Sequence, residues 1–239
     1  MPDKIIHVDS IGNVRFRKNK RSRHVTISIR PIKGVVVNLP YYASYRFALR
    51  VVQNKIPWIL DHLPKVEKIE HRMTVFNQNT EFYTKYRKLV ISPDQINTVK
   101  TLINAEKIHI KYPGHIDITN AEIQKIIRQT IIKALRLEAK SYLPYRTSIL
   151  AKQLNFKFNK IFVKNNQTIW GSCSGVNNIN LNLHLMRLPD HLIDYVIIHE
   201  LCHTKEKNHG KPFWSLMDSI LGDAKKLSKE LKNFSIQLY

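Results

Sequence analysis

The sequence is poor in cysteine and glycine, and it contains no long apolar run. Only two of its 239 residues are cysteine and seven are glycine, which excludes a disulfide framework and a glycine-rich repeat. No apolar stretch reaches the roughly 18 residues of a membrane helix, and Met1–Ile6 lacks the apolar core of a secretion signal. We therefore expect a cytoplasmic protein without a membrane partner, in which Cys173 and Cys202 are free thiols.

Acidic residues are also few compared with basic ones. Lys and Arg number 39 and Asp and Glu number 18, which gives a formal net charge of +21. Such a chain is attracted to polyanions, so nucleic acid is an expected partner. The alternative is that the basic composition only keeps the protein soluble.

At 43% hydrophobic residues, the chain can bury a full core and form one large or two small domains.

Basic side chains gather first near the N-terminus. Six of the ten residues in Arg15–His24 are Lys or Arg. Val25–Arg30 then alternates apolar and polar residues, and after turn residues 31–34 the apolar run Val35–Pro40 follows, so we expect a β-hairpin. The arginines before it could bind phosphate or could protect an exposed sheet edge from aggregation, and both readings remain open.

The middle of the chain alternates helical and extended patterns. Ser44 is expected to cap a helix from Tyr45 to about Leu63, which Pro57 should break or kink. Short strands are expected at residues 82–86, 88–91 and 107–112, separated by turn signals. We assign residues 1–118 to a basic, β-rich N-terminal region.

A long helix opens the second region, residues 119–239. Asn120 is a good N-cap, and apolar residues carry the helical period to about Leu143, where Pro144 should end or bend the helix. Another helical piece at residues 145–154 and a strand at residues 160–164 follow. The mixture predicts an α+β fold, and the last residues, from Ala224 to Leu238, predict a basic amphipathic helix.

The last hundred residues hold the most informative motif. Asn178–Leu185 alternates strictly and predicts a half-buried strand. Pro189 then opens a helix that is apolar nearly all round and should therefore be buried. Its middle reads His199-Glu200-Leu201-Cys202-His203. Histidines four residues apart share a helix face and can bind one metal ion, while Glu200 can reach a water on that ion. A buried carboxylate is costly without such a partner.

These residues resemble the YgjP-like metallopeptidases, which are related to the SprT-like and WLM zinc peptidases of zincin type. The pieces that match are Trp170–Ser174, the Asn-rich strand after it, Ile193–His203, His209, and Phe213 with Trp214. The basic hairpin also looks like the start of that family. Metzincins share the spacing from His203 to His209 but carry a glycine where this chain has Glu206, so the resemblance is not to a metzincin proper.

The resemblance implies a zincin-like C-terminal half in which His199, His203 and His209 bind Zn²⁺ and Glu200 is the catalytic base. Three imidazoles would bind zinc at roughly 2.0–2.1 Å and leave a fourth position open for water. Glu200 would take a proton from that water and pass it to the leaving amine of a protein or peptide substrate. Manganese, cobalt or iron could also occupy three nitrogen ligands.

Several roles at this site have more than one candidate. The oxyanion could be stabilised by Tyr195, by His184 or by the Trp170–Ser174 loop, and the strand at residues 178–185 is expected to be an edge strand that holds an extended substrate. If His209 faced solvent, a nearby carboxylate would replace it as third ligand. The candidates for that replacement are Asp218 and Asp223.

The remaining motif residues have plainer alternatives. Asp194 could orient a ligand histidine or stabilise the helix N-terminus by its charge. Cys202 and Cys173 are expected to serve packing rather than metal binding, as are Phe213 and Trp214.

The sequence therefore predicts a zinc-dependent metallopeptidase, of endopeptidase type, that acts near nucleic acid. The rival function is a nucleic-acid-binding protein with a structural or vestigial zinc site. Glu200 separates the two functions, because a structural site has no use for a base beside an open position.

Overall fold

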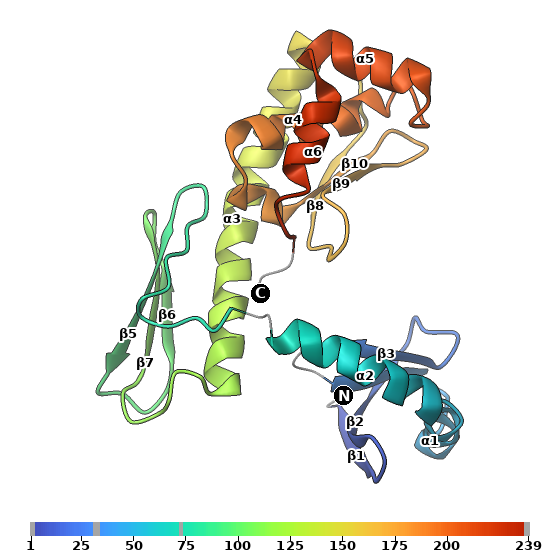
Figure 1. Ribbon diagram of the computed structural model, residues 1–239, viewed down its shortest axis with the longest axis vertical. Helices are drawn as coiled ribbons and strands as arrows, with labels where there is room; N and C mark the ends of the chain where they lie inside the picture. Colours follow the sequence, from blue (N-terminus) through green and yellow to red (C-terminus); the bar gives the residue numbers. More distant parts are fainter. Residues whose placement is uncertain (1–2, 31–33, 72–73, 237–239) are drawn as a thin grey trace. The chain divides into compact units, whose positions relative to one another are not determined.

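The computed structural model describes residues 3–30, 34–71 and 74–236, so the turn predicted at residues 31–34 lies mostly outside the described residues. The fold is α+β, and it divides into two compact units, Met1–Thr74 and Val75–Leu238. Figure 1 shows the small sheets of each unit and the long helix of the second. None of the described helices is long and apolar enough to cross a membrane.

The N-terminal unit is a four-stranded sheet followed by two helices. Its strands are β1 (Lys4–Val8), β2 (Gly12–Asn19), β3 (Thr26–Arg30) and β4 (Gly34–Pro40), in the order β1-β2-β4-β3. The expected hairpin is present as the antiparallel pair β3 and β4, whereas β2 runs parallel to β4. The sequence analysis missed β2 because its basic residues concealed the alternation of Val14 and Phe16, which are both fully buried.

One face of this sheet packs on the helices α1 (Tyr45–Gln53) and α2 (Ile56–His71). Ser44 caps α1 by accepting a hydrogen bond from the backbone N–H of Phe47 at 3.1 Å. The expected break falls just before Pro57, which lies in the first turn of α2, where its missing N–H costs nothing. The buried residues that join sheet and helices are Val14, Phe16, Val35, Val37, Leu39, Ala48, Val52 and Ile59.

The second unit begins with a three-stranded sheet that packs on a long helix. The strands β5 (Lys88–Asp94), β6 (Lys100–Ile103) and β7 (Lys107–Pro113) lie in the order β5-β7-β6. Residues 82–86, expected as a strand, form only an isolated bridge between Tyr83 and Lys88. Apolar residues of β5 and β7 share one core with α3 (Ala121–Gln153). For this reason the chain divides after Thr74, whereas the sequence placed the boundary after residue 118.

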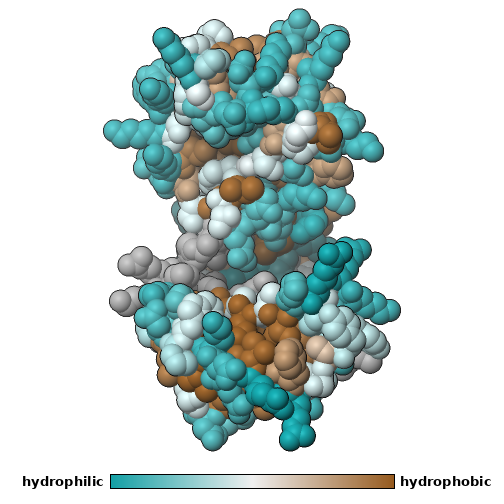
Figure 2. Space-filling view, turned by 90° about the vertical axis from the view of Figure 1, so that its right-hand side faces the viewer, coloured by the Kyte–Doolittle hydropathy of each residue, from teal (hydrophilic) through white to brown (hydrophobic). Residues whose placement is uncertain are grey.

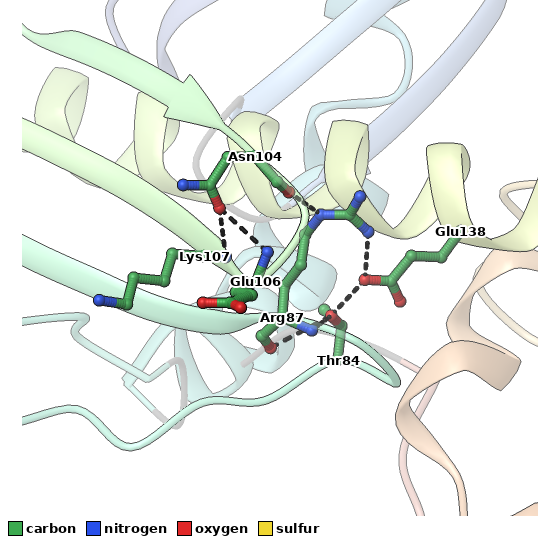
Figure 3. A network of polar contacts seen from close by, with 6 residues as sticks. All are labelled: Thr84, Arg87, Asn104, Glu106, Lys107 and Glu138. Atoms are coloured by element: carbon green, nitrogen blue, oxygen red, sulfur yellow. Dashed lines mark hydrogen bonds and ion pairs between the residues drawn. The ribbon is translucent and has the colours of Figure 1, made fainter.

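A buried ion pair fixes the loop before β5 to α3 (Figure 3). The Glu138 side chain is fully buried, and its Oε1 accepts hydrogen bonds from Thr84 at 2.6 Å and from Arg87 at 2.7 Å. The Arg87 Nε donates in turn to the carbonyl oxygen of Asn104 at 2.6 Å. One carboxylate therefore joins α3 to two loops of the sheet.

Helix α3 continues through Pro144 to Gln153 and so combines the two helical pieces expected there. Residues on both sides of the proline, including Leu143 and Leu150, are buried in the core of the unit. Packing of that face outweighs the hydrogen bond that a proline removes from a helix interior.

The last segment supplies a second small sheet and three helices. The strands β8 (Ile161–Lys164), β9 (Gly171–Cys173) and β10 (Ile179–Asn182) lie in the order β8-β10-β9. A 3₁₀ helix, η1 (Leu183–Arg187), follows β10, and then come α4 (Asp190–Cys202), α5 (Lys211–Leu221) and α6 (Ala224–Leu231). The helix expected up to Leu238 thus ends at Leu231, and residues 237–238 lie outside the described residues.

The strand expected at residues 178–185 is shorter than predicted and lies elsewhere in the sheet. It ends at Asn182, because the next residues turn into η1, where Leu183–Met186 are all buried. Pairing with β8 on one side and β9 on the other makes β10 the central strand. The prediction of an edge strand at this position is therefore wrong, and β9 is the edge strand that lies against α4.

Candidate metal centre

Helix α4 is fixed by packing and by ion pairs at its N-terminal end. Most of its side chains are buried, as its apolar sequence predicted. Asp194 receives two hydrogen bonds from Arg146 of α3, one of 2.7 Å from Nε, and this pair raises the pKa of the arginine. Asp190 pairs with Lys85. Asp194 therefore joins two helices and does not orient a ligand histidine.

Three imidazoles converge beyond this anchored end. His199 lies in the last turn of α4, His203 is the C-cap residue of that helix, and His209 follows in the loop before α5. The Nε2 of His209 lies 3.0 Å from that of His199 and 3.1 Å from that of His203. Ligand atoms of all three lie within 4.8 Å of one another. Tetrahedral ligands at 2.0–2.1 Å from zinc are separated by about 3.3 Å, so the donor set fits such an ion.

The loop after α4 brings His209 to the site and orients His203. The His203 Nδ1 donates to the carbonyl oxygen of Glu206 at 2.9 Å, which leaves the lone pair on Nε2 for a metal. The Glu206 N–H bonds back to Cys202 at 2.9 Å. Glu206, which occupies the position of the metzincin glycine, therefore orients His203 through its backbone carbonyl group.

Phe213 is a residue whose part in the site the sequence did not reveal. It lies fully buried in the first turn of α5, and its ring centroid is 4.9, 4.5 and 4.8 Å from those of His199, His203 and His209. One phenyl ring thus supports all three imidazoles. Its spacing of four residues from His209 and its place among the residues that match the family both fit ordinary core packing equally well.

Burial favours the neutral form of His199 and His203 and disfavours the ionised form of the neighbouring carboxylate. It lowers the pKa of His199 to about 3 and also lowers the pKa of His203, so both rings keep the lone pairs that a metal needs. Burial raises the pKa of Glu200 to about 8. Within the described part of the chain, its Oε2 is buried without a hydrogen-bond partner, as expected of a group that faces a bound ion and its water.

Strand β9 passes directly over the Glu200 carboxylate. A Cβ placed on Gly171 would lie 2.6 Å from Oε1 and 2.9 Å from Cδ of Glu200. Any side chain larger than a hydrogen would displace the carboxylate. The sequence identified the Trp170–Ser174 motif as a loop beside the site but could not show that its glycine makes room for Glu200.

One of the three oxyanion candidates is engaged elsewhere. His184 is 4% exposed and lies between Asn165 and Arg187, at 3.2 and 3.3 Å. The Tyr195 ring centroid lies 6.0 Å from that of His199, and burial raises the pKa of its hydroxyl. The Trp170–Ser174 segment lies beside Glu200.

The other alternative ligands also have structural roles. Asp218 accepts a hydrogen bond from the N–H of Ala224 at 3.0 Å, and Asp223 caps α6 through Lys226 at 2.9 Å. Cys202 is fully buried, and burial raises its thiol pKa to about 12. Burial also raises the pKa of Cys173, which is half-buried. Neither thiol belongs to the group of three histidines among the described residues.

A helix that carries His-Glu-x-x-His, a third histidine in the next loop and a small mixed sheet beside them define a metallopeptidase of zincin type. Comparison with protein families identifies the member. The model of the YgjP-like metallopeptidase domain matches residues 23–234. The chain therefore belongs to the YgjP-like metallopeptidase family, and the sequence-based recognition is confirmed.

Comparisons with individual proteins and solved structures add little to the family assignment. No curated protein matches the chain. Among solved structures, the crystal structure of the metallopeptidase zymogen of Pyrococcus abyssi abylysin matches with 19% identity. That match covers 37% of this chain and 90% of the other, with a TM-score of 0.33, which is too low to define a shared fold.

Proposed function

We propose that this metallopeptidase is a zinc-dependent endopeptidase in which His199, His203 and His209 hold the ion and Glu200 is the general base. The observation that carries the proposal is the convergence of three Nε2 atoms beside a buried glutamate. Zinc is the ion we favour because three imidazole nitrogens leave one position of a tetrahedron open.

When bound, zinc would polarise the peptide carbonyl and acidify the attacking water. The residues of the chain perform the remaining tasks. The Glu206 carbonyl keeps a proton on the Nδ1 of His203, so that Nε2 faces the ion, and Phe213 keeps the three rings in place. Glu200 takes a proton from the water and returns it to the departing amine. The Glu200 Oε2 is buried and has no hydrogen-bond partner among the described residues, so this oxygen is available to accept that proton.

We further propose that β9 holds the substrate. It is an edge strand of its sheet and lies against α4, so an extended peptide could add to it through backbone hydrogen bonds. Since Gly171 lies against Glu200, a peptide paired with this strand would place its backbone close to the base. The half-buried residues 170–174 would then lie close to the oxyanion.

The rival function, a nucleic-acid-binding protein with a structural or vestigial zinc site, accounts for less of this geometry. A structural zinc site closes its fourth position with another protein ligand. Here the neighbouring acidic residue is Glu200 of α4, and its Oε2 has no hydrogen-bond partner among the described residues. That arrangement supports hydrolysis.

The proposed function is tested with purified, zinc-loaded protein and an unfolded protein substrate such as casein. Glu200→Gln should retain one zinc per chain and lose cleavage by a factor of about 10²–10⁴, the usual contribution of a general base. His209→Ala should lose most of its zinc as well. Glu81→Gln, which changes an exposed glutamate away from the site, is the matched control and should behave as the unaltered protein. Normal cleavage by Glu200→Gln would refute the proposal.

A further inference from the structure

The positive charge of the chain is concentrated in the N-terminal unit. Residues 1–74 contain 15 Lys and Arg but only five Asp and Glu, whereas residues 75–239 contain 24 and 13. Nearly half of the net charge of +21 thus belongs to less than a third of the chain. The metal centre lies in the other unit and makes no use of these cations.

The sheet of this unit has one face on the helices and one face that those helices leave open. Alternation along β2 buries Val14 and Phe16 and directs Arg15 and Arg17 to the open face. Arg17 pairs in register with Asn38 of β4, which pairs with Thr26 of β3. These positions form a cationic and polar row across three strands.

The same face is hollowed beside this row. The hollow has a volume of about 350 Å³ and is lined by Arg15, Arg17, Asn19, Ser22, Thr26, Val36 and Asn38. Guanidinium, amide and hydroxyl groups dominate this lining, and the described residues that form it include no carboxylate. The lining suits a phosphate group, which accepts several hydrogen bonds at once.

One carboxylate holds the two arginines together at the rim. The oxygens of Asp3 accept hydrogen bonds from Arg17 Nε at 2.9 Å and from Arg17 Nη2 at 2.7 Å, while an Nη1 of Arg15 lies 3.6 Å away. Both arginine side chains remain about half exposed, at 41% and 51%. The arginines are therefore already positioned for an anion, and Asp3 would weaken the binding of a second anion by its charge.

Exposed aromatic rings lie at the end of the same strands. The register pairs Asn19 with Pro40, and Tyr41 and Tyr42 follow at 47% and 81% exposure. The Lys20 ammonium lies 5.8 Å from the Tyr41 ring centroid, and the Tyr42 hydroxyl donates to the carbonyl oxygen of Arg23 at 3.2 Å. Open rings beside cations are how proteins stack the bases of single strands. An acidic peptide carries no bases that could stack on these rings.

We propose that the open face of the β1-β2-β4-β3 sheet binds single-stranded nucleic acid. Phosphates lie on Arg15 and Arg17 and in the hollow beside them, and bases stack on Tyr41 and Tyr42. The proposal is independent of the peptidase function, because every residue it uses belongs to the N-terminal unit.

The test measures binding of a fluorescent single-stranded oligonucleotide of about 20 nucleotides, longer than one site requires, to the full zinc-loaded chain by anisotropy. The double variant Arg15→Ala/Arg17→Ala should bind at least about tenfold more weakly, and the slope of log K against log salt should fall by about 1.4. The matched control Lys225→Ala/Lys226→Ala removes the same charge from the exposed face of α6 and should change binding less than about threefold.

Two further variants keep the test decisive if the double variant folds poorly. Asp3→Asn should tighten binding several-fold, because it removes the competing charge, and Tyr42→Ala should weaken binding by about fivefold or more. Equal losses in the double variant and in its control would overturn the proposal. So would competition by polyglutamate, or by a duplex of the same sequence, as strong as that of the unlabelled single strand.

Discussion

Gly171 leaves room for the Glu200 side chain, and a substitution at this glycine tests how Glu200 is positioned. Gly171→Ala would place a methyl group 2.6 Å from Oε1, and misplacing a catalytic group by about 1 Å can cost about a hundredfold in rate. We expect cleavage to fall by about 10- to 100-fold while the zinc content stays unchanged. Gly175→Ala is the matched control, because a Cβ there meets nothing within 4 Å. Equal activity of the two variants would show that Glu200 does not depend on Gly171.

His184 gives the protein a dependence of stability on pH. Arg187 donates to its Nδ1 at 3.3 Å, so the ring is neutral, and burial lowers its pKa to about 4. The unfolded chain, with a pKa near 6.5, binds a proton first as the pH falls. The contribution of His184 to the free energy of unfolding is therefore fully present above about pH 6.5. It decreases between about pH 6.5 and pH 4, by on the order of 2 kcal/mol at pH 5.

The measurement compares urea unfolding at pH 7.5 and pH 5 for the unaltered protein and for His184→Gln. Glutamine can still accept from Arg187 and donate to Asn165, but it does not titrate. We expect the variant to lose less stability on acidification. The three clustered histidines are the same in both proteins, so their effect on stability cancels in the difference, and an equal loss in both would contradict the assignment to His184.

At the scale of elements, the buried carboxylate of Glu138 connects α3 to the β5–β7 sheet. Arg87→Met would leave that carboxylate without its cation, although Thr84 would still donate to it. Removing one partner of a buried pair costs about 3–5 kcal/mol, whereas replacing both with apolar residues costs much less. In urea unfolding, we therefore expect Arg87→Met to lose more stability than the double variant Arg87→Met/Glu138→Leu.

The matched control breaks an exposed ion pair on the same sheet. Lys111→Met removes the partner of Asp94, where the side chains are 51% and 34% exposed, and should cost less than about 1 kcal/mol. If Arg87→Met cost no more than this control, the network in Figure 3 would not anchor the sheet.

The elements that sequence reasoning recovered are those whose signal lies within one periodic segment. Helix α4 and its histidine spacing were evident because a helix fixes the relation of residues four apart. Strand β2 was missed because its exposed arginines conceal its buried face, and β10 was misplaced because strand order depends on distant partners. The role of Gly171 could not be predicted, since its neighbour Glu200 is 29 positions away in the sequence.

At the scale of the whole molecule, a basic unit and a peptidase unit belong to one chain. Hydrophilic side chains cover most of the face shown in Figure 2, and smaller apolar areas lie between them. If the N-terminal unit binds nucleic acid, proteins on the same strand reach the peptidase at a raised effective concentration.

This arrangement predicts how nucleic acid affects proteolysis. Cleavage of a protein that binds single-stranded DNA should rise several-fold when that DNA is added, and the rise should disappear at high salt. Arg15→Ala/Arg17→Ala should abolish the increase while cleavage without DNA stays normal. Equal cleavage with and without DNA over a range of salt would count against a link between the two units.

Catalysis by this site requires three imidazoles to share one cation, and X-ray absorption at the zinc edge of the loaded, purified chain measures this directly. We predict one zinc per chain, bound by three imidazole nitrogens and one light atom, with the histidine signal reduced in His209→Ala. A sulfur ligand from Cys173 or Cys202, or an unchanged spectrum in His209→Ala, would contradict it.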